Sequence, residues 1–228
     1  MVIKLKKKYY IFSFDEKFIM LWPNILFVIC AIVMYFPFFE FNSYDFGLML
    51  ILWLPYMISH ELIHGLTYLL MGGSSKKICF GAFIEKGIFY CLHKGNIKRK
   101  NILTSLVTPL IILGIIAYII SLLINSSVLA MLSILNISGC IGDIIMYYHL
   151  VKLKNYEFSE FDNPMSFALH TNEDLSKKKM KGLKFVEVKD KLKITTKDRL
   201  TITPTSWIFM ILLLVGGIMY LLIGKGVL

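Results

Sequence analysis

One long apolar stretch of the chain, residues 46–70, contains three ionisable side chains near its middle. The stretch reads FGLMLILWLPYMISHELIHGLTYLL, and as a helix it is long enough to cross about 30 Å of hydrocarbon. His60, Glu61 and His64 interrupt its apolar pattern. Charged groups at this depth cost several kcal/mol unless a partner compensates them, so they mark a functional site by default.

The spacing of these residues is typical of a metal site. Residues four apart lie on one helix face, so the imidazoles of His60 and His64 can reach a single ion. Glu61 flanks that ion, where its carboxylate can take a proton from zinc-bound water. The alternative is that all three are polar residues packed between helices. The cost of burying them in a membrane favours a zinc site, with Glu61 as the catalytic base.

The composition is that of a polytopic membrane protein. Of 228 residues, 57% are hydrophobic and 18% are charged. We expect a single membrane-embedded domain over residues 1–228, with 152–203 as a cytoplasmic loop. Five stretches of about 20 or more mostly apolar residues are predicted to be transmembrane helices: 19–38, 46–70, 102–124, 128–151 and 204–224.

Short apolar runs in the polar segments predict a limited amount of β-structure. Residues 78–83 and 88–93 flank a Glu-Lys-Gly turn and are expected to form a hairpin, the alternative being a solvated loop. Residues 183–188 and 191–196 suggest a second hairpin. The expected fold class is therefore all-α, with about five transmembrane helices and a short β-hairpin on the cytoplasmic side.

The basic residues orient the predicted helices. All of the 25 Lys and Arg residues except Lys225 fall before the first span, in the loop 71–101 or in the segment 152–203. This asymmetry predicts a multi-pass cell-membrane protein with its N-terminus in the cytoplasm and its C-terminus outside. The net charge of +10 then reflects topology and contact with anionic lipid headgroups, and no nucleic acid partner is expected.

A catalytic zinc usually has three protein ligands and one water. Asp143 is the only other carboxylate within a predicted span, and it lies at about the same depth as His60 and His64, roughly 10–16 Å from the cytoplasmic face. Asp143 is therefore the predicted third ligand. The alternatives lie at the membrane edge or just beyond it, and they are His149, Glu157, Glu160 and Asp162.

Asn136 precedes Asp143 by about two helical turns and so shares nearly the same face. It could hydrogen-bond the substrate backbone or an oxyanion. The alternative is a hydrogen bond between helices. The small residues between Asn136 and Asp143 would let neighbouring helices approach closely.

With the His60–His64 string, Gly65 and the Gly142-Asp143 pair, the chain resembles the site-2-protease-like intramembrane zinc metallopeptidases. The resemblance is closest to a small bacterial group of zincin-type peptidases of otherwise unknown function, and it covers roughly residues 46–170. It implies that His60, His64 and Asp143 bind one zinc per chain and that Glu61 is the catalytic base. Unlike the larger enzymes, this chain has no proline shortly before Gly142-Asp143 and no PDZ-like sequence.

The expected activity is zinc-dependent hydrolysis of peptide bonds in membrane-embedded or membrane-proximal substrates. Two other classes stay open: a metal-binding accessory or immunity protein without proteolytic activity, and a small ion transporter that uses intramembrane His and Asp residues. Glu61 argues against the first, because a purely structural site needs no base. The absence of detectable repeats argues against the second. Richness in Ile and Lys indicates an AT-rich bacterial genome.

Overall fold

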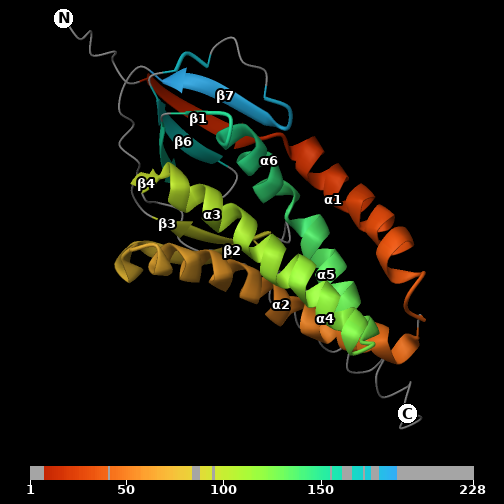
Figure 1. Ribbon diagram of the computed structural model, residues 1–228. Helices are drawn as coiled ribbons and strands as arrows, with labels where there is room; N and C mark the ends of the chain where they lie inside the picture. Colours follow the sequence, from red (N-terminus) through yellow and green to blue (C-terminus); the bar gives the residue numbers. More distant parts are fainter. Residues whose placement is uncertain are drawn as a thin grey trace, which may run out of the picture.

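A computed structural model shows a helical part with a five-stranded sheet at one end (Figure 1). The structure describes residues 8–40, 42–83, 88–93, 96–154, 156–160, 166–171, 173–175 and 180–188. The predicted span 204–224 lies outside the described residues. That residues 1–228 form one domain stays a prediction.

The helices follow the first four predicted spans. Three of these spans are divided into shorter pieces. The divisions at Pro109 and at the non-helical Cys140 interrupt the backbone ladder, whereas α1 passes into a π-helix at Ala31 without a proline at the junction. In chain order the pieces are α1 (Glu16–Cys30) with the π-helix η1 (Ala31–Tyr35), α2 (Ser43–Leu70), α3 (Arg99–Pro109) with the π-helix η4 (Leu110–Ile116) and α4 (Ala117–Leu123), and α5 (Ser127–Gly139) with α6 (Ile141–Leu150).

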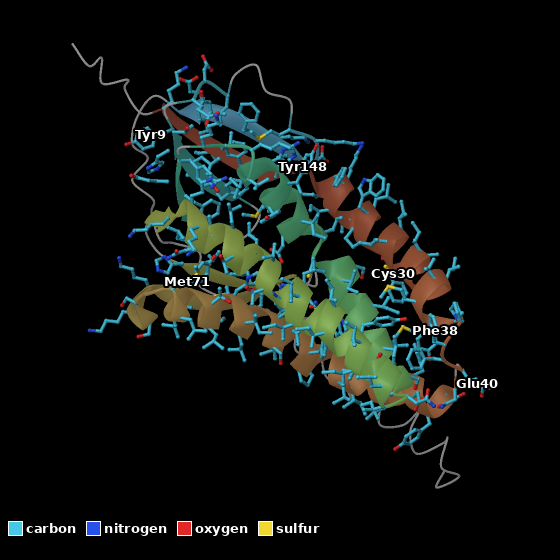
Figure 2. The ribbon with its side chains drawn as sticks, in the orientation of Figure 1. Tyr9, Cys30, Phe38, Glu40, Met71 and Tyr148 are labelled. Carbon is cyan, nitrogen blue, oxygen red and sulfur yellow. The ribbon has the colours of Figure 1, made fainter. Side chains whose placement is uncertain are left out.

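Three of these helical stretches are long and apolar enough to cross a membrane: Lys17–Tyr35, Ser43–Leu70 and Arg99–Leu123. The pair α5 and α6 passes the same test together but bends by 44°. Glu40, before α2, and Met71, after it, lie at opposite ends of the helical part, and Tyr148 lies at the end that carries the sheet (Figure 2). The number of crossings and their direction stay predictions.

The expected all-α fold class is wrong. The described residues form a mixed α/β structure with a two-stranded sheet and a five-stranded antiparallel sheet of order β4-β5-β6-β1-β7. Three of its strands come from the segment predicted to be a cytoplasmic loop. The five strands are β1 (Lys8–Phe14), β4 (Asn96–Lys98), β5 (Tyr156–Glu160), β6 (Ser166–Thr171) and β7 (Leu183–Val188).

Strand β1, which lies between β6 and β7, explains why the sequence did not predict the sheet. β1 pairs with β6 on one edge and β7 on the other, so its partners lie more than 150 residues away along the chain. Phe12 of β1 is fully buried, and its ring stacks on Phe167 of β6 at 5.0 Å between centroids. A short alternating run is a weak local signal, and such a strand is stabilised mainly by these distant cross-strand contacts.

The two-stranded sheet confirms the first hairpin at the predicted residues. β2 (Ile78–Phe83) pairs antiparallel with β3 (Ile88–His93). Of the second predicted hairpin, residues 183–188 form strand β7, which pairs with β1. Residues 191–196 lie outside the described residues. The β2–β3 sheet packs against α2 at Gly65, where an added Cβ would lie 2.7 Å from the ring of Phe80.

The side chains of His149 and Arg99 link the helices to the segments that lead into strands β5 and β7. His149 Nε2 in α6 lies 3.0 Å from the carbonyl oxygen of Lys181, to which it can donate a hydrogen bond. Arg99, at the start of α3, donates to the carbonyls of Val151 and Leu153 at 2.8 and 2.9 Å. The Arg99 contacts satisfy two carbonyls that follow α6 and have no helical partner of their own.

Replacing Phe12 by Ala should lower the free energy of unfolding by about 3–5 kcal/mol, because it leaves a cavity between the rings of Phe167 and Phe185. Chemical denaturation of the detergent-solubilised protein would measure the change. Val186→Ala in β7 is the matched control, since Val186 is 68% exposed and its loss should have little effect. Equal effects of the two substitutions would contradict the role of Phe12 in the core of the sheet.

Candidate metal centre

The two histidines of the His-Glu-x-x-His string occupy one face of α2. His60 and His64 are each 7% exposed, and their Nε2 atoms lie 3.1 Å apart. The continuous helix brings them together, because four residues make slightly more than one turn. The predicted placement of both imidazoles at a single point is therefore present in the structure.

Asp143 reaches the same point from a different helix. The chain leaves helical geometry at Cys140, and α6 starts at Ile141, so Asp143 lies in its first turn. Its Oδ2 lies 3.3 Å from His60 Nε2 and 3.4 Å from His64 Nε2. Within the described residues these three side chains are the one group of His, Cys, Asp or Glu ligands close enough to hold a metal ion.

The distances among the three ligand atoms suit zinc. Tetrahedral zinc with bonds of about 2.0–2.1 Å separates its ligand atoms by about 3.3 Å. The three observed distances of 3.1, 3.3 and 3.4 Å lie close to that value. Two nitrogens and one carboxylate oxygen form the donor set of a catalytic zinc site, which leaves a fourth position for water. The residues present therefore fit the ion that the sequence predicts.

Hydrogen bonds on the far side of each ring orient the imidazoles. His60 Nδ1 lies 2.8 Å from Asn136 Oδ1, and His64 Nδ1 lies 3.0 Å from the carbonyl oxygen of Ser105. Both oxygens accept, so each Nδ1 carries the proton. Each Nε2 then has a free lone pair directed at the cluster, and two such acceptors 3.1 Å apart would repel without a cation between them.

Glu61 lies beside the three ligand residues without being one of them. Its side chain accepts a hydrogen bond from the backbone of Cys91 in β3, and it lines the same cavity as His60, His64 and Asp143. Strand β3 therefore fixes the direction of the carboxylate. That Glu61 acts as a base stays a prediction.

The cavity at the cluster has a volume of about 690 Å³. Its walls come from α1, α2, β3, α5, α6 and the five-stranded sheet, and they are mainly apolar and aromatic. On the sheet side they include Phe14, Phe158 and Phe167. Next to the ligands, Trp53 and Met57 of α2 continue the apolar wall. The polar cluster is therefore open to a large apolar chamber.

The rival third ligands are engaged elsewhere or lie outside the described residues. His149 bonds to the Lys181 carbonyl, and Glu157 lies in β5 opposite Lys98 and His170. Glu160 ends β5, and Asp162 is outside the described residues. Among the candidates for the third ligand in the described residues, Asp143 is thus the one that the structure brings to the two histidines.

Two polar residues of the site hold the ligands in place. Asn136 forms the interhelical hydrogen bond that was the alternative to substrate binding, since its amide group is occupied by His60 and the Pro109 carbonyl. The sequence analysis missed Ser105, which is fully buried in α3. Its only sequence signal is a polar residue in an apolar span. The nearer of its two contacts to His64 Nδ1 is made by the backbone carbonyl at 3.0 Å, which no side-chain motif reveals, and the hydroxyl lies at 3.2 Å.

Metal analysis of the purified protein tests the ligand assignment. We expect about one zinc per chain, lost when Asp143 or His60 is replaced by Ala, because each removes one of three ligands. His149→Ala is the matched control and should retain zinc, since His149 bonds to the Lys181 carbonyl. Mass spectrometry of the metal content would measure this. Zinc retained in Asp143→Ala and lost in His149→Ala would overturn the assignment.

Comparison with known proteins agrees with this geometry. Residues 53–158 match the model of a protein family described as "Putative zincin peptidase". The matched region includes His60, Glu61, His64, Asn136 and Asp143. No curated protein and no solved structure matches the chain. The match supports the resemblance to the small group of zincin-type peptidases and, with it, a zinc peptidase in general.

Proposed function

We propose that this protein is a zinc-dependent endopeptidase that hydrolyses peptide bonds of membrane-embedded or membrane-proximal substrates. The observation that carries the proposal is the convergence of His60, His64 and Asp143 within 3.1–3.4 Å, with Glu61 at the rim of the same apolar cavity. The family match supports the peptidase part of the proposal. The location of the cluster within apolar helices supports the membrane part.

The residues divide the chemical work between them. His60, His64 and Asp143 would hold the zinc, which when bound polarises a carbonyl and makes its water more acidic. Glu61 takes a proton from the attacking water as the new C–O bond forms. It then delivers that proton to the amine nitrogen as the C–N bond breaks. Transfer of the second water proton from the new carboxylic acid to the amine leaves a carboxylate and an ammonium group. The hydrogen bond from Cys91 keeps the Glu61 carboxylate aimed during both transfers.

Substrate binding has to solve a backbone problem. A helix hides its peptide bonds in its own hydrogen bonds, so a membrane-embedded substrate must unwind locally, and its freed backbone groups then need new partners. The β2–β3 sheet has such groups at its edges. Strand β3 lines the cavity through residues that include Phe89 and Tyr90, so a substrate could bind as a further strand along it.

The register of the hairpin identifies the edge groups. Cys91 is paired with Phe80, and its backbone bonds to Glu61 instead of crossing the ladder. In an antiparallel pair the groups that point outward alternate with those that bond across. The backbone of Phe89, two residues earlier and paired with Ala82, is therefore expected to face the cavity side as well.

Replacing Glu61 by Gln should abolish cleavage and retain zinc, because the amide cannot accept the water proton. We expect a loss of about 100-fold or more. The measurement compares new N-termini in membranes of cells that express either form, together with metal content. Glu157→Gln, a carboxylate in β5, is the control and should cleave normally. Unchanged N-termini in Glu61→Gln would favour the non-proteolytic accessory or transporter functions.

Replacing Phe89 by Pro should reduce cleavage and leave zinc bound, because proline removes one outward-facing amide without breaking a bond to β2. The matched control is Ala82→Pro at the partner position in β2, which removes an outward amide on the far edge. The same assay of N-termini applies to both. Equal activity of the two variants would exclude strand addition at β3.

A further inference from the structure

The carbonyl that orients His64 is unusual for the interior of a helix. The carbonyl of Ser105 would normally accept the backbone N–H of the residue four positions later. That residue is Pro109, which has no N–H. The carbonyl oxygen of Ser105 instead lies 3.0 Å from His64 Nδ1 on α2, closer than the Ser105 hydroxyl, which lies 3.2 Å from the same nitrogen. The missing N–H therefore explains why a main-chain acceptor inside α3 is available to a ligand of the metal centre.

The proline also shapes the backbone around that carbonyl. A proline ring inside a helix pushes against the carbonyl four residues before it and turns it away from the helix axis. Pro109 is fully buried, and the π-helix η4 begins directly after it. The amide of Leu110 bonds to the carbonyl of Val107, so it does not compete for Ser105. The helix thus leaves the Ser105 acceptor to His64.

The same residue is connected to the other histidine. Asn136 Nδ2 donates to the carbonyl oxygen of Pro109 at 3.2 Å, and Asn136 Oδ1 accepts from His60 Nδ1 at 2.8 Å. This contact fixes which end of the amide faces His60. Close packing of η4 on α5 allows it, since a Cβ added to Gly114 would lie 2.9 Å from Ile137. The carbonyl of Pro109 therefore orients His60 through Asn136, and the carbonyl of Ser105, which Pro109 leaves without a helical donor, orients His64.

We propose that Pro109 is a positioning residue for the metal centre. Its missing N–H leaves the Ser105 carbonyl to His64, and its own carbonyl anchors the amide of Asn136 that orients His60. The proposal deepens the proposed function and rests on it for its purpose, but the hydrogen bonds themselves do not depend on a bound ion. Groups that orient metal-binding histidines typically change metal affinity about 10- to 100-fold when they are lost.

The test restores the missing N–H. Pro109→Ala and Pro109→Val each supply a backbone N–H for Ser105, and Val retains more of the buried volume. Pro55→Ala is the matched control, since Pro55 lies inside α2, is exposed, and has its carbonyl bonded by Ser59. Zinc affinity, measured by chelator competition, should fall about 10- to 100-fold in both Pro109 variants and stay unchanged in Pro55→Ala.

A second measurement separates positioning from a general loss of structure. In the metal-free protein, at a pH that keeps both rings neutral, ¹⁵N NMR reports which nitrogen of each histidine carries the proton. Pro109→Ala and Asn136→Leu are compared in a Ser105→Ala background, which removes the hydroxyl 3.2 Å from His64 Nδ1 and keeps the carbonyl. There, Pro109→Ala should make His64 lose its Nδ1–H preference, whereas His60 should keep it because residue 109 retains its carbonyl. In Asn136→Leu the reverse is expected. If Pro109 and Asn136 only supported the fold, each substitution would change the tautomers of both histidines.

The outcomes also distinguish this proposal from the proposed function. If the native chain binds no zinc, the peptidase proposal fails, while the histidine tautomers still test the role of Pro109. If zinc binds equally well to the native chain and both Pro109 variants, and His64 keeps its tautomer, the role of Pro109 is excluded. Failure of both Pro109 variants to fold would exclude it too, because restoring a helical hydrogen bond should be tolerated.

Discussion

The metal centre depends on two hydrogen bonds made on the side of the imidazoles that faces away from it. In an apolar interior, a polar ring that lacked a partner for Nδ1 would be costly and free to turn. Asn136 and the carbonyl of Ser105 supply those partners at 2.8 and 3.0 Å. They select the tautomer in which both Nε2 atoms point at Asp143, and this makes a cation at the centre favourable.

Interruptions in the helices bring these groups together. The break at Cys140 starts α6 just before Asp143, and Pro109 ends α3 where the carbonyls needed by His64 and Asn136 are located. A second bond supports this docking, since Tyr56 donates to the carbonyl of Leu113 at 2.6 Å. Tyr56 and His64 are eight residues apart on α2, as are Leu113 and Ser105 on the other helix. The contacts therefore fix the register of two neighbouring helices.

Both sheets contribute to the wall of the cavity, together with the helices that hold the ligands. β3 bonds to Glu61, and aromatic residues of the five-stranded sheet line the far side of the cavity of about 690 Å³. The cavity therefore combines a polar cluster, the Glu61 carboxylate and an apolar wall. In the proposed peptidase this arrangement would bind an apolar peptide, keep bulk water away and present the strand edge to its backbone.

Local patterns in the sequence were enough to predict part of the site and one of the two sheets. Spacing placed His60, Glu61 and His64 on one helix, depth in the span selected Asp143, and short apolar runs beside a turn located the strands 78–83 and 88–93. The tertiary structure alone decided the five-stranded sheet and the orienting groups. β1 is stabilised by partners more than 150 residues away, and the acceptor for His64 is a backbone carbonyl. No side-chain pattern encodes either, because both depend on which distant segments the fold brings into contact.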